Sequence, residues 1–142
     1  MYKKILISTD GTESNRHAVD DGIRLAKALG AEVTALFVFD IGNYSNVGTG
    51  IGIPVDREYV INTSEEALAY AKEQGEKAGV KVTLKMVSGH PAEAIVEESA
   101  SHDLVVCGTL GRAGLSRALL GSVAEKVVRF SYAPVLVCRK PK

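Results

Sequence analysis

The sequence predicts a doubly wound α/β domain: an open, parallel, five-stranded sheet with helices on both faces. Short apolar runs alternate with segments of helical periodicity along the whole chain, which is typical of parallel strands joined by right-handed crossovers. The length of 142 residues suits one hydrophobic core. An apolar content of 46% with 24% charged residues is that of an ordinary globular protein. We therefore expect residues 1–142 to form one domain.

The first part of the chain predicts two strands, one helix and a loop. Lys4–Thr9 is an apolar run and predicts the first strand. Across Ser14–Leu29 apolar or small residues recur at helical spacing, and Gly30 follows as a stop signal. Glu32–Phe39 predicts the second strand. The segment Asp40–Val55 is rich in glycine and asparagine and has no period, so it predicts a long loop.

The rest of the chain continues the alternation. Thr63 followed by Glu66 is a capping-box pattern and predicts a helix that ends at Gly79, with Arg57 as an alternative start. The remaining predicted elements are a strand at Lys81–Val87, a helix opened by Pro91, a strand at Asp103–Cys107, a helix starting at Gly121–Ser122 and a strand at Ala133–Cys138. The third strand alternates charged or polar residues with apolar ones, which favours a sheet edge. Two strand orders fit this pattern, 2-1-3-4-5 and 3-2-1-4-5, and periodicity does not choose between them.

A crevice for ligand is expected wherever the strand order reverses, because two loops diverge there at the carboxyl ends of the strands. In the order 3-2-1-4-5 the facing loops are Thr9–Thr12 and the glycine-rich segment Cys107–Val123, which reads CGTLGRAGLSRALLGSV. Asp10, in the first of these loops, fits either a turn cap or a ligand contact.

The glycine-rich segment has the composition of an anion cradle. Glycine lets the backbone approach a ligand closely, and the free N–H groups and dipole of a helix start attract an anion. The groups that would act in this way are Gly108, Gly111, Gly121, the hydroxyl of Ser122 and the charges of Arg112 and Arg117. By composition alone, a plain surface turn fits as well. The segment is not a P-loop, because no Gly-Lys-Ser or Gly-Lys-Thr ends it.

The spacing Gly108-x2-Gly111-x9-Gly121-Ser122 resembles the nucleotide motif of the ATP-binding universal stress proteins. The opening KILISTDGTESNRHAV and the closing LLGSVAEKVVRFSYAPVLVCR resemble the same family, so the likeness covers essentially the whole chain. It implies a Rossmann-like sheet of order 3-2-1-4-5 that binds ATP or another adenine nucleotide. The resemblance implies adenine or ribose contacts from Thr9, Asp10 and Val38, and ribose or phosphate contacts from Cys107, Gly108, Gly111, Gly121, Ser122 and Val123. Leu110 departs from the many relatives that carry a polar or basic residue there.

Catalysis is not expected to be efficient. Hydrolysis of ATP needs a base that positions water, usually with a metal ion, and the segment from Gly108 to Ser122 contains no Asp, Glu or His. Mg²⁺ or Mn²⁺ could arrive with the phosphates, held by Ser122 and water. Three other functions stay open: a nucleotide-independent dimeric interaction protein, a slow ATPase or phosphotransferase, and a receiver domain. The last lacks the acidic cluster expected at the first strand end.

Charge and composition narrow the expected partners. The 17 basic and 17 acidic residues cancel, so no basic field recruits nucleic acid or an anionic membrane. No apolar run approaches the ~20 residues of a membrane span, and the apolar N-terminal segment is too short for a signal peptide, so we expect a cytoplasmic protein. The two cysteines and three histidines show no metal-ligand spacing. In the order 3-2-1-4-5 the apolar fifth strand (Val135, Leu136, Val137) is an edge, which favours a homodimer, as does the family resemblance. A further protein partner is unknown.

Overall fold

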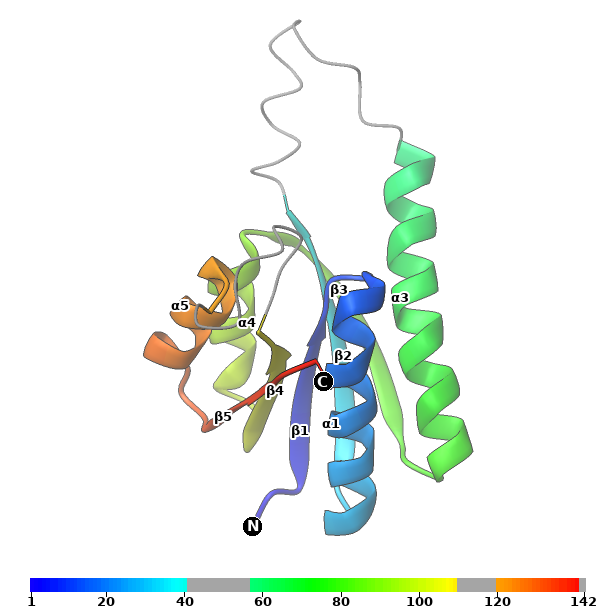
Figure 1. Ribbon diagram of the computed structural model, residues 1–142, viewed down its shortest axis with the longest axis vertical. Coiled ribbons are helices and arrows are strands. Elements are labelled where there is room, and N and C mark those ends of the chain that lie inside the picture. Colours follow the sequence, from blue (N-terminus) through cyan, green and yellow to red (C-terminus); the bar gives the residue numbers. More distant parts are fainter. Residues whose placement is uncertain (41–56, 110–119, 141–142) are drawn as a thin grey trace, which may run out of the picture.

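The computed structural model describes residues 1–40, 57–109 and 120–140, with residues 57–60 described by their backbone alone. Strands and helices alternate along these ranges (Figure 1). The strands are β1 (Lys4–Thr9), β2 (Glu32–Asp40), β3 (Val82–Gly89), β4 (Leu104–Gly108) and β5 (Val135–Cys138). The helices are α1 (Arg16–Leu29), α3 (Arg57–Ala78), α4 (Pro91–Ser99) and α5 (Ser122–Phe130), and a short 3-10 helix, η1 (Glu13–Asn15), precedes α1.

The five strands form one parallel sheet in the order β3-β2-β1-β4-β5. This confirms the 3-2-1-4-5 order that the family resemblance implies, and it places β3 and β5 at the two edges. The order reverses between β1 and β4. The loops that follow these two strands therefore diverge from the same edge of the sheet.

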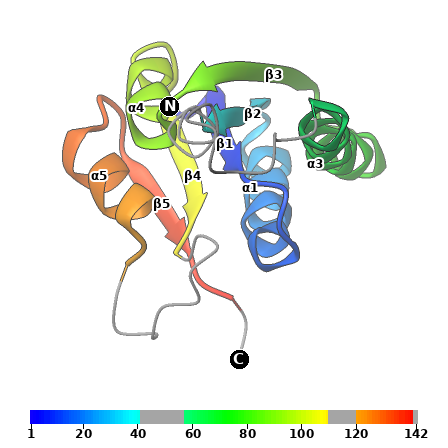
Figure 2. The same ribbon diagram turned by 90° about the horizontal axis from the view of Figure 1, so that it is seen from above.

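Helices cover both faces of the sheet, as predicted. Figure 2 shows α1 and α3 on one side and α4 and α5 on the other. β1 lies at the centre, where Ile5, Leu6 and Ile7 are fully buried because neighbouring strands and helices enclose them. Ile5 and Ile7 pack under α1 with Val19 and Ile23, whereas Leu6 faces Ile95 of α4 and Val127 of α5.

Several predicted boundaries need correction. Asp40 is the last residue of β2 and not the first of the loop, and the rest of that predicted loop, residues 41–55, lies outside the described residues. The second long helix begins at Arg57, the alternative start, so Thr63 and Glu66 lie within it and do not form its capping box. The fifth strand starts at Val135, two residues later than expected. Pro91 does open its helix at the first position, as predicted.

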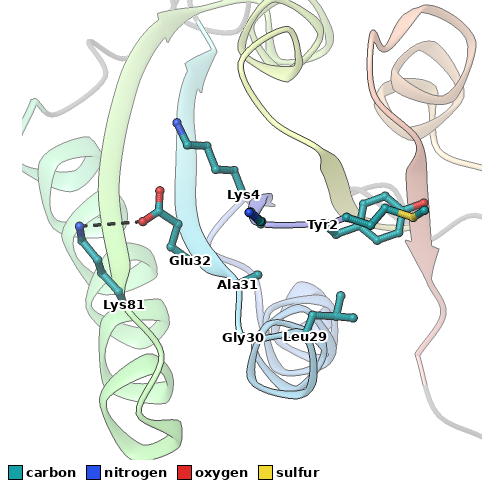
Figure 3. A pocket seen from close by; sticks show the side chains of 9 residues that line it. Tyr2, Lys4, Leu29, Gly30, Ala31, Glu32 and Lys81 are labelled. Carbon is teal, nitrogen blue, oxygen red and sulfur yellow. Dashed lines mark ion pairs between the residues drawn. The ribbon is translucent and has the colours of Figure 1, made fainter.

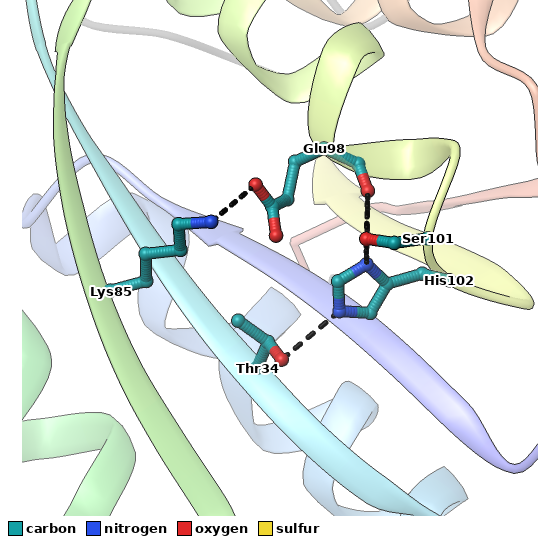
Figure 4. A network of polar contacts seen from close by, with 5 residues as sticks. All are labelled: Thr34, Lys85, Glu98, Ser101 and His102. Atoms are coloured by element: carbon teal, nitrogen blue, oxygen red, sulfur yellow. Dashed lines mark hydrogen bonds and ion pairs between the residues drawn. The ribbon is translucent and has the colours of Figure 1, made fainter.

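Strand β3 is an edge strand, as its alternation predicted, but neither of its faces is fully covered. Leu84 and Met86, on the α3 side, are 39% and 53% exposed. On the other side Lys85 forms an ion pair of 2.8 Å with Glu98 of α4. His102, just after α4, bonds through Nε2 to the hydroxyl of Thr34 at 3.0 Å, so polar contacts hold the end of α4 against β2 and β3 (Figure 4).

Candidate functional site

The carboxyl ends of β1, β2 and β4 place the predicted contact residues at one edge of the sheet. Thr9 ends β1 and pairs with Phe37 of β2, so Val38 lies one residue further along β2. Ile7 pairs with Val106, and continuing this register sets Thr9 beside Gly108, the last residue of β4. Thr9, Asp10 and Gly108 therefore lie together at the switch point, and Val38 lies beside Thr9 and Asp10 on the neighbouring strand β2.

Asp10 closes the turn after β1 with one of its two carboxylate oxygens. The backbone amide and the hydroxyl of Thr12 donate to Asp10 Oδ1 at 2.9 and 2.6 Å. Within the described part of the chain, Oδ2 has no hydrogen bond. The two readings of Asp10 are thus compatible, because Oδ1 holds the turn while Oδ2 stays available to a ligand donor.

Gly11 is a residue of this turn to which sequence reasoning gave no role. Its φ of +80° lies in the left-handed region that favours glycine. A Cβ there would also lie 3.3 Å from Thr63 Cγ2 and 3.4 Å from Ala67 Cβ. The turn that carries Asp10 therefore packs against α3. The Asp-Gly pair, a common turn signal, was the clue in the sequence.

The two ends of the glycine-rich segment meet beside β5. The amide of Thr109 donates to the carbonyl oxygen of Cys138 at 3.2 Å, and the amide of Gly121 donates to the carbonyl oxygen of Thr109 at 2.8 Å. Gly108 and the start of α5 are thus brought together, as predicted. The Gly121 amide, however, is engaged and is not one of the free donors that the sequence suggested.

The start of α5 fits an anion. Gly121 is its N-cap residue and, as a glycine, offers no side chain for capping, so Ser122 is the first helical residue. The amides of the first helical turn have no partner within a helix, and the Ser122 side chain is exposed beside them. Amides without a partner among the described residues, an exposed hydroxyl and the helix dipole make a site of the kind that binds phosphate.

The other predicted contacts divide into core residues and residues that are not described. Val38 and Val123 are partly buried and pack against the core on the α4 and α5 side. Gly111 and Arg112 lie outside the described residues, as do Leu110 and Arg117.

Cys107 is a packing residue. It is 4% exposed, and burial raises the pKa of its thiol to about 11. Burial, followed by the carboxylate of Asp21, raises the pKa of Cys138 to about 12. Both thiols are protonated at neutral pH and so are not nucleophiles. Cys107 can meet a ligand only through its main chain.

The described residues offer no metal cluster, and a hollow lies away from the switch point. Across residues 1–40, 57–109 and 120–140, no group of three His, Cys, Asp or Glu side chains could hold a metal ion. No helix in those ranges is long and apolar enough to cross a bilayer. A hollow of about 620 Å³ lies at the amino ends of β1 and β2, where Lys81 and Glu32 approach to 4.0 Å (Figure 3). It is at the end of the strands opposite the switch point.

Comparison with known proteins agrees with this geometry. The chain matches the Universal stress protein family over residues 1–139. It is 41% identical to Universal stress protein MJ0531 of Methanocaldococcus jannaschii, over 100% of this chain and 85% of that protein. It is similar to the structure of hypothetical protein MJ0577, with a TM-score of 0.74 and 32% identity over 100% of this chain and 99% of that one. It is also similar to a universal stress protein in complex with cAMP, with a TM-score of 0.72 and 25% identity over 99% and 98% of the two chains. The chain therefore belongs to the universal stress protein family.

Proposed function

We propose that this protein is a cytoplasmic, ATP-binding regulatory protein that works as a homodimer and hydrolyses ATP slowly at best. The observation that carries the proposal is the hydrogen bond from the Gly121 amide to the Thr109 carbonyl oxygen, 2.8 Å long. It holds the start of α5 next to the end of β4, at the point where the strand order reverses. The turn that carries Asp10 leaves the same edge of the sheet.

The side chains and amides present match the two ends of an adenine nucleotide. The uncapped start of α5, with Ser122, suits the phosphates. Asp10 Oδ2, which has no hydrogen bond within the described residues, suits a donor such as a ribose hydroxyl or the adenine amine. Val38, at the end of the neighbouring strand, is proposed to supply apolar surface to the nucleoside. The similar universal stress protein solved with cAMP supports an adenine ligand.

Slow hydrolysis is proposed because the glycine-rich segment itself offers no base. The segment from Gly108 to Ser122 has no acidic residue or histidine. Glu125, in the first turn of α5, forms an ion pair of 2.7 Å with Arg129 and is thereby held to its own helix. A divalent cation such as Mg²⁺ or Mn²⁺ is proposed to accompany the phosphates.

A dimer through β5 is proposed on the exposure of that edge. β5 is the last strand of the sheet, and Leu136 is 41% exposed there while Val135 and Val137 are partly exposed. An apolar edge strand of this kind invites pairing, and a two-fold axis would cover both copies.

Calorimetric titration with ATP tests the proposal, with Gly121→Tyr as the comparison. We expect the wild-type protein to bind ATP and Gly121→Tyr, which crowds the start of α5, to lose binding while circular dichroism shows an intact fold. A flat titration of the wild type, together with no nucleotide in the purified protein, would favour the nucleotide-independent interaction protein. Steady release of phosphate at more than a few turnovers per minute would favour an ATPase.

A further inference from the structure

The amino end of α1 is in direct contact with the place where β4 and β5 end. Asn15, the residue before α1, is 6% exposed. Its Nδ2 atom lies 2.8 Å from the position that a Cβ on Gly108 would take. His17 bonds through Nε2 to the carbonyl oxygen of Cys138 at 3.0 Å, and that oxygen also accepts from the Thr109 amide. The amino end of α1 thus contacts the last residue of β4, where the glycine-rich segment begins, and the last residue of β5.

Asn15 is a polar residue at a buried position where an apolar side chain would be expected if packing were its sole role. Its side-chain Oδ1 is buried and has no hydrogen-bond partner among the described residues, and such a group normally lowers the stability of a protein. It occupies the N-cap position of α1 but makes no capping hydrogen bond. Neither capping nor a saturated hydrogen-bond network explains the asparagine. The remaining explanation is the volume that its side-chain amide occupies next to Gly108.

Because the Asn15 amide lies so close, residue 108 has no room for a side chain. The described glycines with positive φ are Gly11, Gly30, Gly79 and Gly89, so the backbone at Gly108 does not itself require glycine. A Cβ at Gly108 would instead meet Asn15 Nδ2 at 2.8 Å, closer than side chains normally approach. The burial of Asn15 restricts where its amide could move.

We propose that Asn15 is a positioning residue of the nucleotide site. Its amide packs against Gly108 and sets where the backbone of Gly108 and Thr109 lies. The inference rests on the proposed function, because nucleotide affinity is one of its readouts. Its second readout, thermal stability, does not depend on a ligand.

A double-mutant cycle with ATP as the probe tests the proposal. We expect Gly108→Ala to weaken ATP binding about tenfold and Asn15→Ala to weaken it about threefold, sizes typical of coupled neighbours. In the double variant the new methyl group fills the space that the amide leaves, so binding should be no weaker than in Asn15→Ala alone. Asn62→Ala, which shortens an exposed asparagine on α3, is the matched control and should not rescue Gly108→Ala.

Three results would overturn the proposal. If Gly108→Ala binds ATP as the wild type does, Asn15 does not constrain residue 108. If the losses in the double variant simply add, the glycine serves the ligand directly. If the two sites are coupled in thermal unfolding but all variants keep the wild-type ATP affinity, the contact is structural only.

The stability readout separates this inference from the proposed function. Should the wild type bind no ATP, the proposed function fails and with it the role of Asn15 in binding. The contact between Asn15 and residue 108 is still tested by thermal unfolding. Gly108→Ala should lower Tm by roughly 2–4 °C, and adding Asn15→Ala to it should restore most of that loss. Additive Tm shifts would contradict this contact as well.

Discussion

The two carboxylate oxygens of Asp10 lie in different surroundings. Its Oδ1 atom accepts both hydrogen bonds from Thr12, which shapes the turn, whereas Oδ2 has none within the described residues. Because the two oxygens differ in their surroundings, a substitution can remove the negative charge of Asp10 while it keeps the acceptor that Thr12 needs.

Asp10→Asn should keep the turn and weaken ATP binding. Asparagine retains an Oδ1 acceptor for Thr12 but loses the charge, and hydrogen bonds to charged groups contribute about 1.5–3 kcal/mol, so the ATP Kd should rise about tenfold or more. Calorimetric titration measures the change, with the exposed neighbouring substitution Glu13→Gln as control. An unchanged Kd in Asp10→Asn would remove the carboxylate from the proposed site.

Tyr70 joins α3 to α1 through a polar contact whose pH dependence can be measured. Its hydroxyl donates to Asp20 Oδ1 at 2.7 Å, and the guanidinium carbon of Arg16 lies 4.7 Å from the ring centroid. Burial first, and then the hydrogen bond to Asp20, raise the pKa of Tyr70 from 10.0 to about 12. A raised pKa means that this stabilisation is complete below pH 10 and is lost as the pH rises through about 12.

Tyr70→Phe should therefore lower the free energy of unfolding by about 1 kcal/mol at pH 8, since the ring stays under Arg16 and only the hydrogen bond is removed. The difference from the wild type should shrink as the pH rises above 10. Urea unfolding at a series of pH values measures it, with the 76% exposed Tyr132 changed to Phe as control. A difference that stays constant up to pH 12 would contradict the assigned hydrogen bond.

Helices α1 and α3, which cover one face of the sheet, each have a glycine where they pack closest to a strand. A Cβ on Gly22 of α1 would lie 2.5 Å from Ile7 Cδ1, and a Cβ on Gly75 of α3 would collide with Val82 Cγ2. Alanine is the better helix former by about 1 kcal/mol. Close packing therefore outweighs helix propensity at both positions.

Gly75→Ala should destabilise the protein by about 1–3 kcal/mol, because the added methyl group overpacks the contact between α3 and β3. Adding Val82→Ala removes the colliding atom and should recover part of the loss. Urea unfolding of the two single variants and the double variant tests this. If Gly75→Ala is as stable as the wild type, α3 does not contact β3 as closely as described.

The strands and helices could largely be predicted from the sequence, because each reflects a local pattern. The alternation in Lys81–Val87 indicated an edge strand, and β3 is one. The strand order is a property of pairing between distant segments, so it followed only from the family resemblance. Helix starts were less predictable: α3 begins at Arg57, so the Thr63 capping pattern lies inside it.

The candidate site could be predicted only in part, because some of its features follow from local sequence and others from contacts between distant segments. The strand order that the resemblance implied brings Gly108 and the start of α5 together and sets Asp10 at the switch point, as expected, whereas the predicted phosphate contacts stay a prediction. The use of the Gly121 amide by Thr109 and the burial of Asn15 depend on how β4, β5 and α1 meet. These contacts join segments that are distant in the sequence, so no local sequence pattern predicts them.

At the scale of the whole molecule, the two edges of the sheet differ in their expected role. Each edge carries an exposed leucine: Leu136 on β5, at 41%, and Leu84 on β3, at 39%. Leu136→Glu should give a monomer, because it places charge in the proposed interface. Leu84→Glu is the matched control and should stay a dimer. Light scattering after size exclusion measures both masses, and a dimeric Leu136→Glu with a monomeric Leu84→Glu would move the interface to β3.

The most direct test of the nucleotide site is native mass spectrometry of the protein purified without added ligand and then incubated with ATP. A cradle formed by the start of α5 and the Asp10 turn predicts a dimer that carries one adenine nucleotide per subunit, and Gly121→Tyr should appear as the same dimer without it. A wild-type spectrum that shows no bound nucleotide, even after incubation with millimolar ATP, would contradict the site.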